Sequence, residues 1–142
     1  MRDAPSFPWT SRTPSWQVGE GNGTVGNGSL VQRWRRTGDG AFLIVQKLLF
    51  GTSTAPGGSS VWSFDLPGYV ANDSVDYYPM SAFAWDASAA TPYACGALLS
   101  FPSEPAALLA YYQNQRISST WPFTWAVGDY LVIGNAVEAY NL

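Results

Sequence analysis

The chain contains no histidine, one cysteine and a single lysine among its 142 residues. Histidine is the usual base that activates a serine or cysteine nucleophile, and it is also the commonest metal ligand. One cysteine provides neither a disulfide nor a zinc or iron-sulfur cluster of the usual spacing. Most hydrolase mechanisms therefore lose their base, and we expect no enzyme activity, no metal and no cofactor.

Clustered positive charge and long apolar runs are also missing. The net charge is -3 with a pI near 4.6, and the longest basic run is Arg35-Arg36. Nucleic-acid binding needs a clustered positive face, so we do not expect it. No stretch of about 18 apolar residues predicts a membrane span. The first residues lack the apolar segment of a secretory signal, which favours a protein made and assembled in the cytoplasm.

Charged residues as a class are scarce, whereas aromatic residues are abundant. Only 12% of the residues are charged, about half of the roughly 25% that is usual in soluble domains. The chain nevertheless carries 7 Trp, 8 Tyr and 7 Phe, which are too many for one small core. Exposed aromatic patches usually mark subunit contacts or ligand surfaces. The composition therefore predicts an obligate oligomer.

Residues 1–28 show no sustained periodicity and are rich in glycine and proline. We interpret them as an extended N-terminal arm, with residues 29–142 forming one head domain. In one interpretation the arm anchors the protein on a neighbour; its candidate anchoring residues are Pro5, Pro8, Trp9, Pro14 and Trp16. In the alternative, Trp9 and Trp16 fold back onto their own domain.

From Ser29 onward the sequence is typical of short strands separated by turns. Residues 30–36 alternate between two faces, Asp39-Gly40 predicts a hairpin, and residues 41–50 form a nearly continuous apolar run that favours a buried strand. Further strands are expected at 61–66, 80–86, 93–101, 106–113 and 129–140, although 106–113 also has helical propensity. The pattern predicts an all-β fold, an antiparallel β-sandwich of jelly-roll type.

Candidate contact residues are aromatic. Tyr77 and Tyr78 follow Asp73 and Asp76 in a predicted loop at 69–79, which makes them candidates for an exposed ligand or surface contact. Other rings suited to stacking on sugars or packing against a neighbour are Tyr111, Tyr112, Trp121 and Trp125.

Acidic and sulfur-containing side chains offer weaker candidates. Asp73, Asp76 and Asp86 are the carboxylates that a glycoside hydrolase would need, but turns and caps account for Asp73 and Asp86. Cys95 lies in an apolar strand-like context, where it is expected to be a small core residue rather than a reactive thiol.

Several segments together resemble a known family. Residues 27–30, 33–35, 48–52, 61–67 and 122–133 are similar to a pattern in tail-fibre and minor tail proteins of bacteriophages that infect actinobacteria. The resemblance covers roughly Gly26 to Tyr140, and each motif alone is only moderately specific. It implies a compact β-sandwich head, usually trimeric, on the surface of the virion. Those relatives end long fibre chains, whereas this sequence contains no shaft.

The resemblance leaves two virion roles open. In the first, the domain is a tail-fibre or receptor-binding head whose outer loops contact host-surface glycans. In the second, it decorates and stabilises the capsid, with residues 1–28 gripping the shell and a homotrimer capping each site. Both imply other virion proteins as partners. A carbohydrate-active enzyme is the remote alternative.

Overall fold

The computed structural model describes residues 8–36, 42–67, 77–100 and 107–134. These residues form eleven strands and no helix, so the all-β prediction is confirmed for them. No described segment is a helix capable of crossing a membrane. The strands are β1 Thr10–Arg12, β2 Trp16–Val18, β3 Gly21–Asn22, β4 Ser29–Arg36, β5 Phe42–Leu49, β6 Trp62–Asp65, β7 Tyr77–Asp86, β8 Thr91–Ser100, β9 Ala107–Tyr112, β10 Gln115–Arg116 and β11 Tyr130–Gly134.

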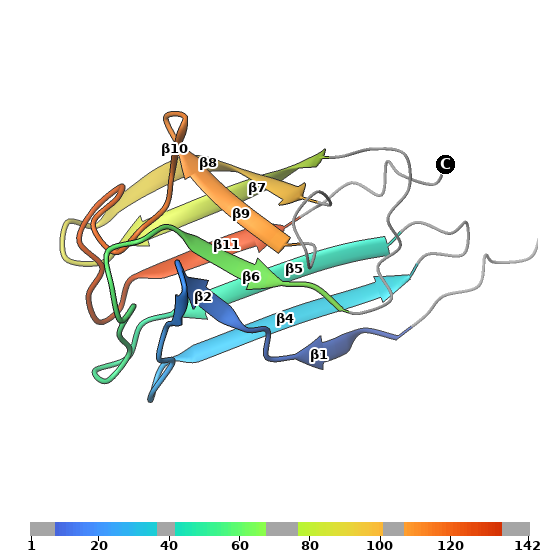
Figure 1. The fold of residues 1–142 in the computed structure, drawn as a ribbon, viewed down its shortest axis with the longest axis horizontal. Coiled ribbons are helices and arrows are strands. Elements are labelled where there is room, and N and C mark those ends of the chain that lie inside the picture. The colour runs from blue at the N-terminus through green and yellow to red at the C-terminus, as the bar shows by residue number, and fades with distance from the viewer. Residues whose placement is uncertain (1–7, 37–41, 68–76, 101–106, 135–142) are drawn as a thin grey trace, which may run out of the picture.

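All strand pairs are antiparallel and belong to one sheet, in the order β1-β4-β5-β11-β7-β8-β9-β6-β2-β3, with β10 attached to β9. The sheet curls into a half-barrel (Figure 1). Antiparallel all-β architecture is thus confirmed, whereas the sandwich and jelly-roll descriptions stay predictions.

The N-terminal strands connect the two ends of this sheet. β1 pairs with β4 at one edge, and β2 pairs with β6 near the other, with only residues 13–15 between them. Pro14 is buried within this connection. Because proline has no backbone N–H, it needs no ladder partner where the chain passes from one edge to the other. The segment therefore holds the curled sheet together at its open side.

A polar network, here called the seam, forms where the two edges approach; it consists of Arg12, Gln32, Gln46 and Asp65. Arg12 donates from Nη1 to Gln32 Oε1 at 2.7 Å and forms an ion pair with Asp65 at 3.2 Å. Gln32 in turn donates to Gln46 Oε1 at 3.0 Å and to the Asp65 carbonyl at 2.9 Å. Both glutamines are almost fully buried, and these bonds offset the cost of removing their amides from water.

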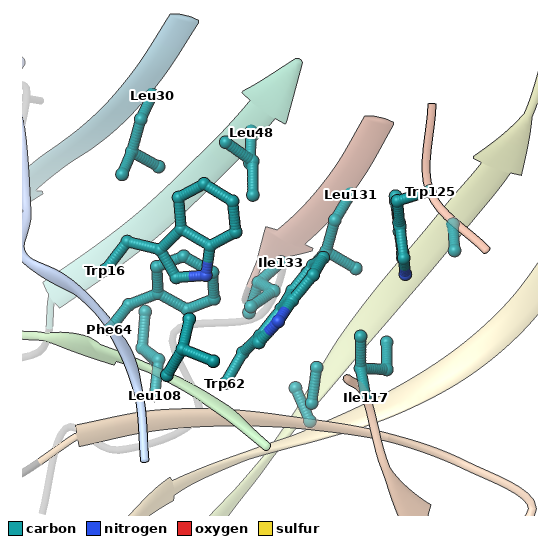
Figure 2. Close-up of a cluster of buried hydrophobic side chains, with 14 of the residues drawn as sticks. Trp16, Leu30, Leu48, Trp62, Phe64, Leu108, Ile117, Trp125, Leu131 and Ile133 are labelled. Atoms are coloured by element: carbon teal, nitrogen blue, oxygen red, sulfur yellow. The ribbon is translucent and has the colours of Figure 1, made fainter. Parts of the chain in front are cut away.

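The core is built around an aromatic cluster. Trp16 packs edge-on against Trp62, with ring centroids 5.1 Å apart, and lies 5.9 Å from Phe50. Trp125 approaches Trp62 at 5.0 Å. Aliphatic side chains from β4, β5, β9 and β11 surround these rings, as Figure 2 shows for Leu30, Leu48, Leu108, Leu131 and Ile133. Several strands far apart in sequence therefore meet on one core.

The extended arm is corrected over residues 10–22, which belong to the sheet as β1, β2 and β3. Trp16 is 3% exposed and packs within its own domain, so it is not accessible as an anchor. The physical reason is the large apolar area of an indole, which is removed from water in the aromatic cluster. Pro8 and Trp9 are exposed, and Pro5 lies outside the described residues.

Most other strand predictions are confirmed with shifted ends. β4, β5, β6 and β8 match their predicted segments, and β9 confirms the strand interpretation of 106–113 over the helical one. The loop predicted at 69–79 is wrong at its end, because Tyr77 and Tyr78 begin β7. The turn at Asp39-Gly40 lies outside the described residues, although β4 and β5 do pair as a hairpin would require.

Candidate functional site

Three of the four described carboxylates, all of them aspartates, serve the fold. Asp65 belongs to the seam and also accepts from the Ser15 amide at 2.8 Å. Asp129 is 1% exposed and accepts from the amides of Ala87 and Ala126 at 2.7 and 2.6 Å. Asp86 accepts from Ser88 Oγ at 2.9 Å within the turn that follows β7. Each of these three side chains has a local structural task.

No arrangement of acids suited to catalysis or metal binding occurs in the part of the chain that the structure describes. There, no group of three or more candidate ligands gathers in one place. Of the three candidate acids of a glycoside hydrolase, Asp86 is occupied in its turn, and Asp73 and Asp76 lie outside the described residues.

Cys95 lies on β8, partly buried against the core. Burial raises the pKa of its thiol to about 11, with an opposing contribution from a backbone hydrogen bond. At neutral pH almost no thiolate exists at this pKa. The side chain therefore behaves as the small core residue that the sequence predicts.

A different kind of surface lies on the outside of the sheet. We call it the outer face: it consists of the outward-pointing residues of β1, β4, β5, β11 and β7 and the neighbouring Trp9. Alternation along each strand places these residues opposite the buried ones. The residues that define it are Trp9, Val31, Arg33, Arg35, Leu43, Val45, Lys47, Leu49, Phe83, Trp85, Tyr130 and Val132.

Large apolar groups are unusually exposed on the outer face. Val31 is 41% exposed, Val45 39% and Trp9 38%. On β11 and β7, Tyr130 lies directly opposite Trp85, with ring centroids 6.4 Å apart, and Phe83 is 5.8 Å from Tyr130. Three rings therefore form a continuous platform beside exposed aliphatic side chains, the composition expected of a contact surface.

The charges of the outer face have one sign. The guanidinium groups of Arg33 and Arg35 lie 5.2 and 5.0 Å from the centre of the Trp9 ring, and Lys47 Nζ lies 4.5 Å from that of Tyr130. Cations over aromatic faces are attracted by the ring quadrupole. The described carboxylates all lie elsewhere, at Glu20, Asp65, Asp86 and Asp129. The face is thus positive in a chain that is negative overall.

A second aromatic group, here called the loop-end cluster, consists of Tyr93, Tyr112, Trp121 and Phe123. Tyr93 lies 5.3 Å from Tyr112 and 5.1 Å from Phe123, and Tyr112 lies 5.7 Å from Trp121. The indole of Trp121 donates to the Tyr112 carbonyl at 2.9 Å, which fixes its orientation. All four rings are only partly buried, so this cluster continues the core outward to the surface.

The structure separates the sequence-predicted contact residues. Trp121 and Tyr112 lie together in the loop-end cluster, whereas Trp125 is buried in the core. Tyr77 and Tyr78 start β7, opposite Ser100 and Leu99 of β8. Trp9 belongs to the outer face and not to a separate arm.

Sequence reasoning missed the outer face. Its signal was present in the alternation of residues 42–49, since every second residue of that apolar run points outward. Lys47 is the one polar residue among the outward-pointing positions of this run, and its presence did not exclude a buried strand. Only the pairing of β5 with β4 and β11 identifies which neighbours share that side.

Comparison with known proteins gives no relative. No family model matches the chain, and neither the curated proteins nor the solved structures yield a match.

Proposed function

We propose that this protein is a non-enzymatic structural protein of a bacteriophage particle, a surface-displayed head that works as a homo-oligomer, a trimer according to the resemblance to tail-fibre domains. The observation that carries the proposal is the outer face. It exposes valines, aromatic rings and cations together, with no described acid among them, while the described aspartates serve the fold. A surface of this composition suits a chain that works inside an assembly.

Receptor binding is favoured over capsid decoration by the position of the loop-end cluster. The chain enters the described part near Trp9 and leaves it at Gly134, and both positions lie at one end of the sheet, as the register through Arg33 and Val45 requires (Figure 1). The loop-end cluster lies near the turns at the opposite end. Its half-buried rings beside exposed amide and hydroxyl groups, such as Gln113, suit contact with sugars.

Capsid decoration is the second candidate, and it has less support than the sequence suggested. That role relied on residues 1–28 as a gripping arm. Two of the proposed anchors, Pro14 and Trp16, are buried in the domain itself, which leaves Pro8 and Trp9 as the exposed described candidates.

Immunogold electron microscopy of particles from cultures that produce the chain tests the proposal. Label at the tail tip supports a receptor-binding head, and label spread over the shell supports decoration. Unlabelled particles, with the chain found only in free form, would contradict both virion roles. Release of sugars from host polysaccharide by the purified protein would instead support the carbohydrate-active enzyme.

Receptor binding is tested separately with purified, fluorescently labelled protein and host cells. We expect Trp121→Ala to lower cell binding at least about fivefold, because loss of a ring that anchors a contact costs about 1 kcal/mol or more. Trp9→Ala, which removes an exposed ring from the outer face, is the matched control and should retain cell binding. Equal binding by both variants and the parent would contradict a glycan contact at the loop end.

A further inference from the structure

The two kinds of side chain on the outer face occupy opposite corners. Along β4 and β5, Arg33 and Arg35 lie toward the end where β4 finishes. Across the face, Tyr130 and Trp85 lie toward the end where β11 begins, with Phe83 one step further along β7. The arginine corner and the ring corner are therefore diagonal to each other.

Aliphatic residues fill the space between these corners. Val45 of β5 lies opposite Gly134 of β11, and Val132 lies opposite Lys47. Val45 and Val132 are thus diagonal neighbours on adjacent strands, at the centre of the face. The arginine corner cannot contact the ring corner of the same molecule, because β5 lies between β4 and β11 and the two corners lie toward opposite ends of these strands.

We propose that the outer face binds the outer face of a second copy of this chain around a two-fold axis. The axis lies in the plane of contact and crosses, at right angles, the line that joins the arginine corner to the ring corner. This rotation places the arginine corner of each copy over the ring corner of its partner, twice per contact. The strands of the two sheets then cross close to a right angle, which is one of the two usual arrangements of packed sheets.

The pairing of cations with aromatic rings identifies a second copy as the occupant. Both guanidinium groups lie against the Trp9 ring, and Arg33 is exposed, so it can also meet a partner's rings. A two-fold contact uses both corners and buries the central valines against each other. A nucleic acid would use only the three cations of the face and would leave the rings and valines unpartnered.

The composition of the face also fits a protein partner. Interfaces between proteins are enriched in aromatic residues and arginine and depleted in acids and lysine. The outer face has four rings, two arginines, one lysine and no described acid. The two-fold contact does not depend on a virion, because it forms between purified copies of one chain. It is also compatible with the proposed trimer, since it would join two trimers to each other.

The decisive variant is Val45→Glu, measured by sedimentation equilibrium of the purified full chain. Val45 lies close to the axis and directly opposite Arg33 on β4. Each introduced carboxylate is therefore buried near its copy in the partner, and it also draws Arg33 away from the partner's rings. We expect the particle mass to halve, with the dissociation constant of the paired form raised about thirtyfold or more. Halving applies whether the parent is a dimer or a pair of trimers.

Val127→Glu is the matched control. Val127 is 59% exposed in a turn before β11 and lies off the outer face, so the same substitution there should leave the mass unchanged. An unchanged mass for Val45→Glu, or a parent that is already a monomer or a lone trimer, overturns the two-fold contact. A lone trimer would leave the proposed function standing.

A mixing experiment tests the diagonal arrangement itself. One variant carries Arg33→Gln with Arg35→Gln, and the other carries Phe83→Ala with Trp85→Ala. Each variant alone lacks both arginine-on-ring contacts, whereas a mixed pair restores one of them. We expect mixed pairs above the random fraction in native mass spectrometry, with melting curves confirming that both variants fold. A random distribution overturns the arrangement.

Discussion

The two faces of β5 differ more than their sequence suggests. Ile44, Gln46 and Leu48 point inward and are almost completely buried, although one of them is an amide. Val45 and Lys47 point outward, and the valine is 39% exposed. The buried side thus contains a polar group, while the exposed side carries apolar groups.

The difference shows that polarity alone does not assign a face. Gln46 is tolerated inside because its side-chain oxygen accepts a hydrogen bond from Gln32, which is itself bonded to Arg12 and to the Asp65 carbonyl. Val45 remains outside because the described residues offer it no covering layer, and a partner can provide one. Burial on this strand is therefore set by which groups find partners and not by hydropathy alone.

The largest expected effect comes from removing a ring on the inner side. Trp16→Ala should lower the free energy of unfolding by about 3–5 kcal/mol, because it leaves a cavity beside Trp62, Phe50 and Phe64. Chemical denaturation followed by circular dichroism measures this. If Trp16 were instead an anchor outside the domain, stability would stay unchanged and only particle binding would fall.

Trp9→Ala gives the matched comparison on the outer side. Trp9 is 38% exposed and contacts two arginines over its face. We expect a change in unfolding free energy of no more than about 1 kcal/mol, the range of an exposed cation-aromatic contact. A loss of unfolding free energy comparable to that of Trp16→Ala would show that rings on the two faces contribute equally to stability.

A smaller and cleaner contrast is available between adjacent residues of β5. Ile44→Ala should destabilise the monomeric chain by about 2–4 kcal/mol, since the side chain is 1% exposed in the core. Val45→Ala should change it by about 0.5 kcal/mol, as surface positions usually do. Denaturation of both variants at low protein concentration, where the second copy is dissociated, checks the comparison. Equal losses would mean that a further part of the chain covers the outer face.

The long strands could be predicted from sequence because they alternate and are bounded by turn residues. β4 and β5 extend over eight residues each, long enough for the period of two to be visible. β1, β2 and β3 have only three, three and two residues, interrupted by Pro14 and Gly19. Segments so short have no period, and only pairing with distant strands reveals them.

The start of β7 was missed for a related reason. Pro79 favours a loop prediction, because proline cannot donate to a ladder. In the described sheet, β11 pairs with β7 only as far as Ser81, while β8 continues past Pro79 to Tyr77. Pro79 therefore lies in a part of β7 that has one described neighbouring strand, β8. The sequence around Pro79 does not indicate how far β11 extends.

The sequence indicates that the candidate surfaces are aromatic, but it does not indicate where on the fold they lie. Abundant rings and scarce charge indicate aromatic surface; in the structure Trp9 is exposed and the other rings of both aromatic groups are partly buried. Their grouping depends on register, since Tyr130 meets Trp85 across a separation of 45 residues in sequence. The seam could not be predicted from sequence either, because Arg12 and Asp65 lie on β1 and β6, toward opposite ends of the strand order.

The smallest expected effect concerns Cys95, which lies at the partly buried margin of the inner side. Burial raises the pKa of its thiol to about 11 from an ordinary value of 9.0. A raised pKa means that folding favours the neutral thiol. This stabilisation is fully present below pH 9 and is lost as the pH rises through about 11.

The measurable consequence is slow alkylation. At pH 8 the thiolate fraction of Cys95 should be about a hundredfold lower than in the unfolded chain, because two pKa units separate the states. The iodoacetamide reaction rate should therefore increase up to about pH 11 in the folded protein and level off near pH 9 in urea. Equal reaction rates in the folded and the unfolded protein would show that water reaches Cys95 on β8. The inner side of the sheet would then not be protected from solvent at that strand.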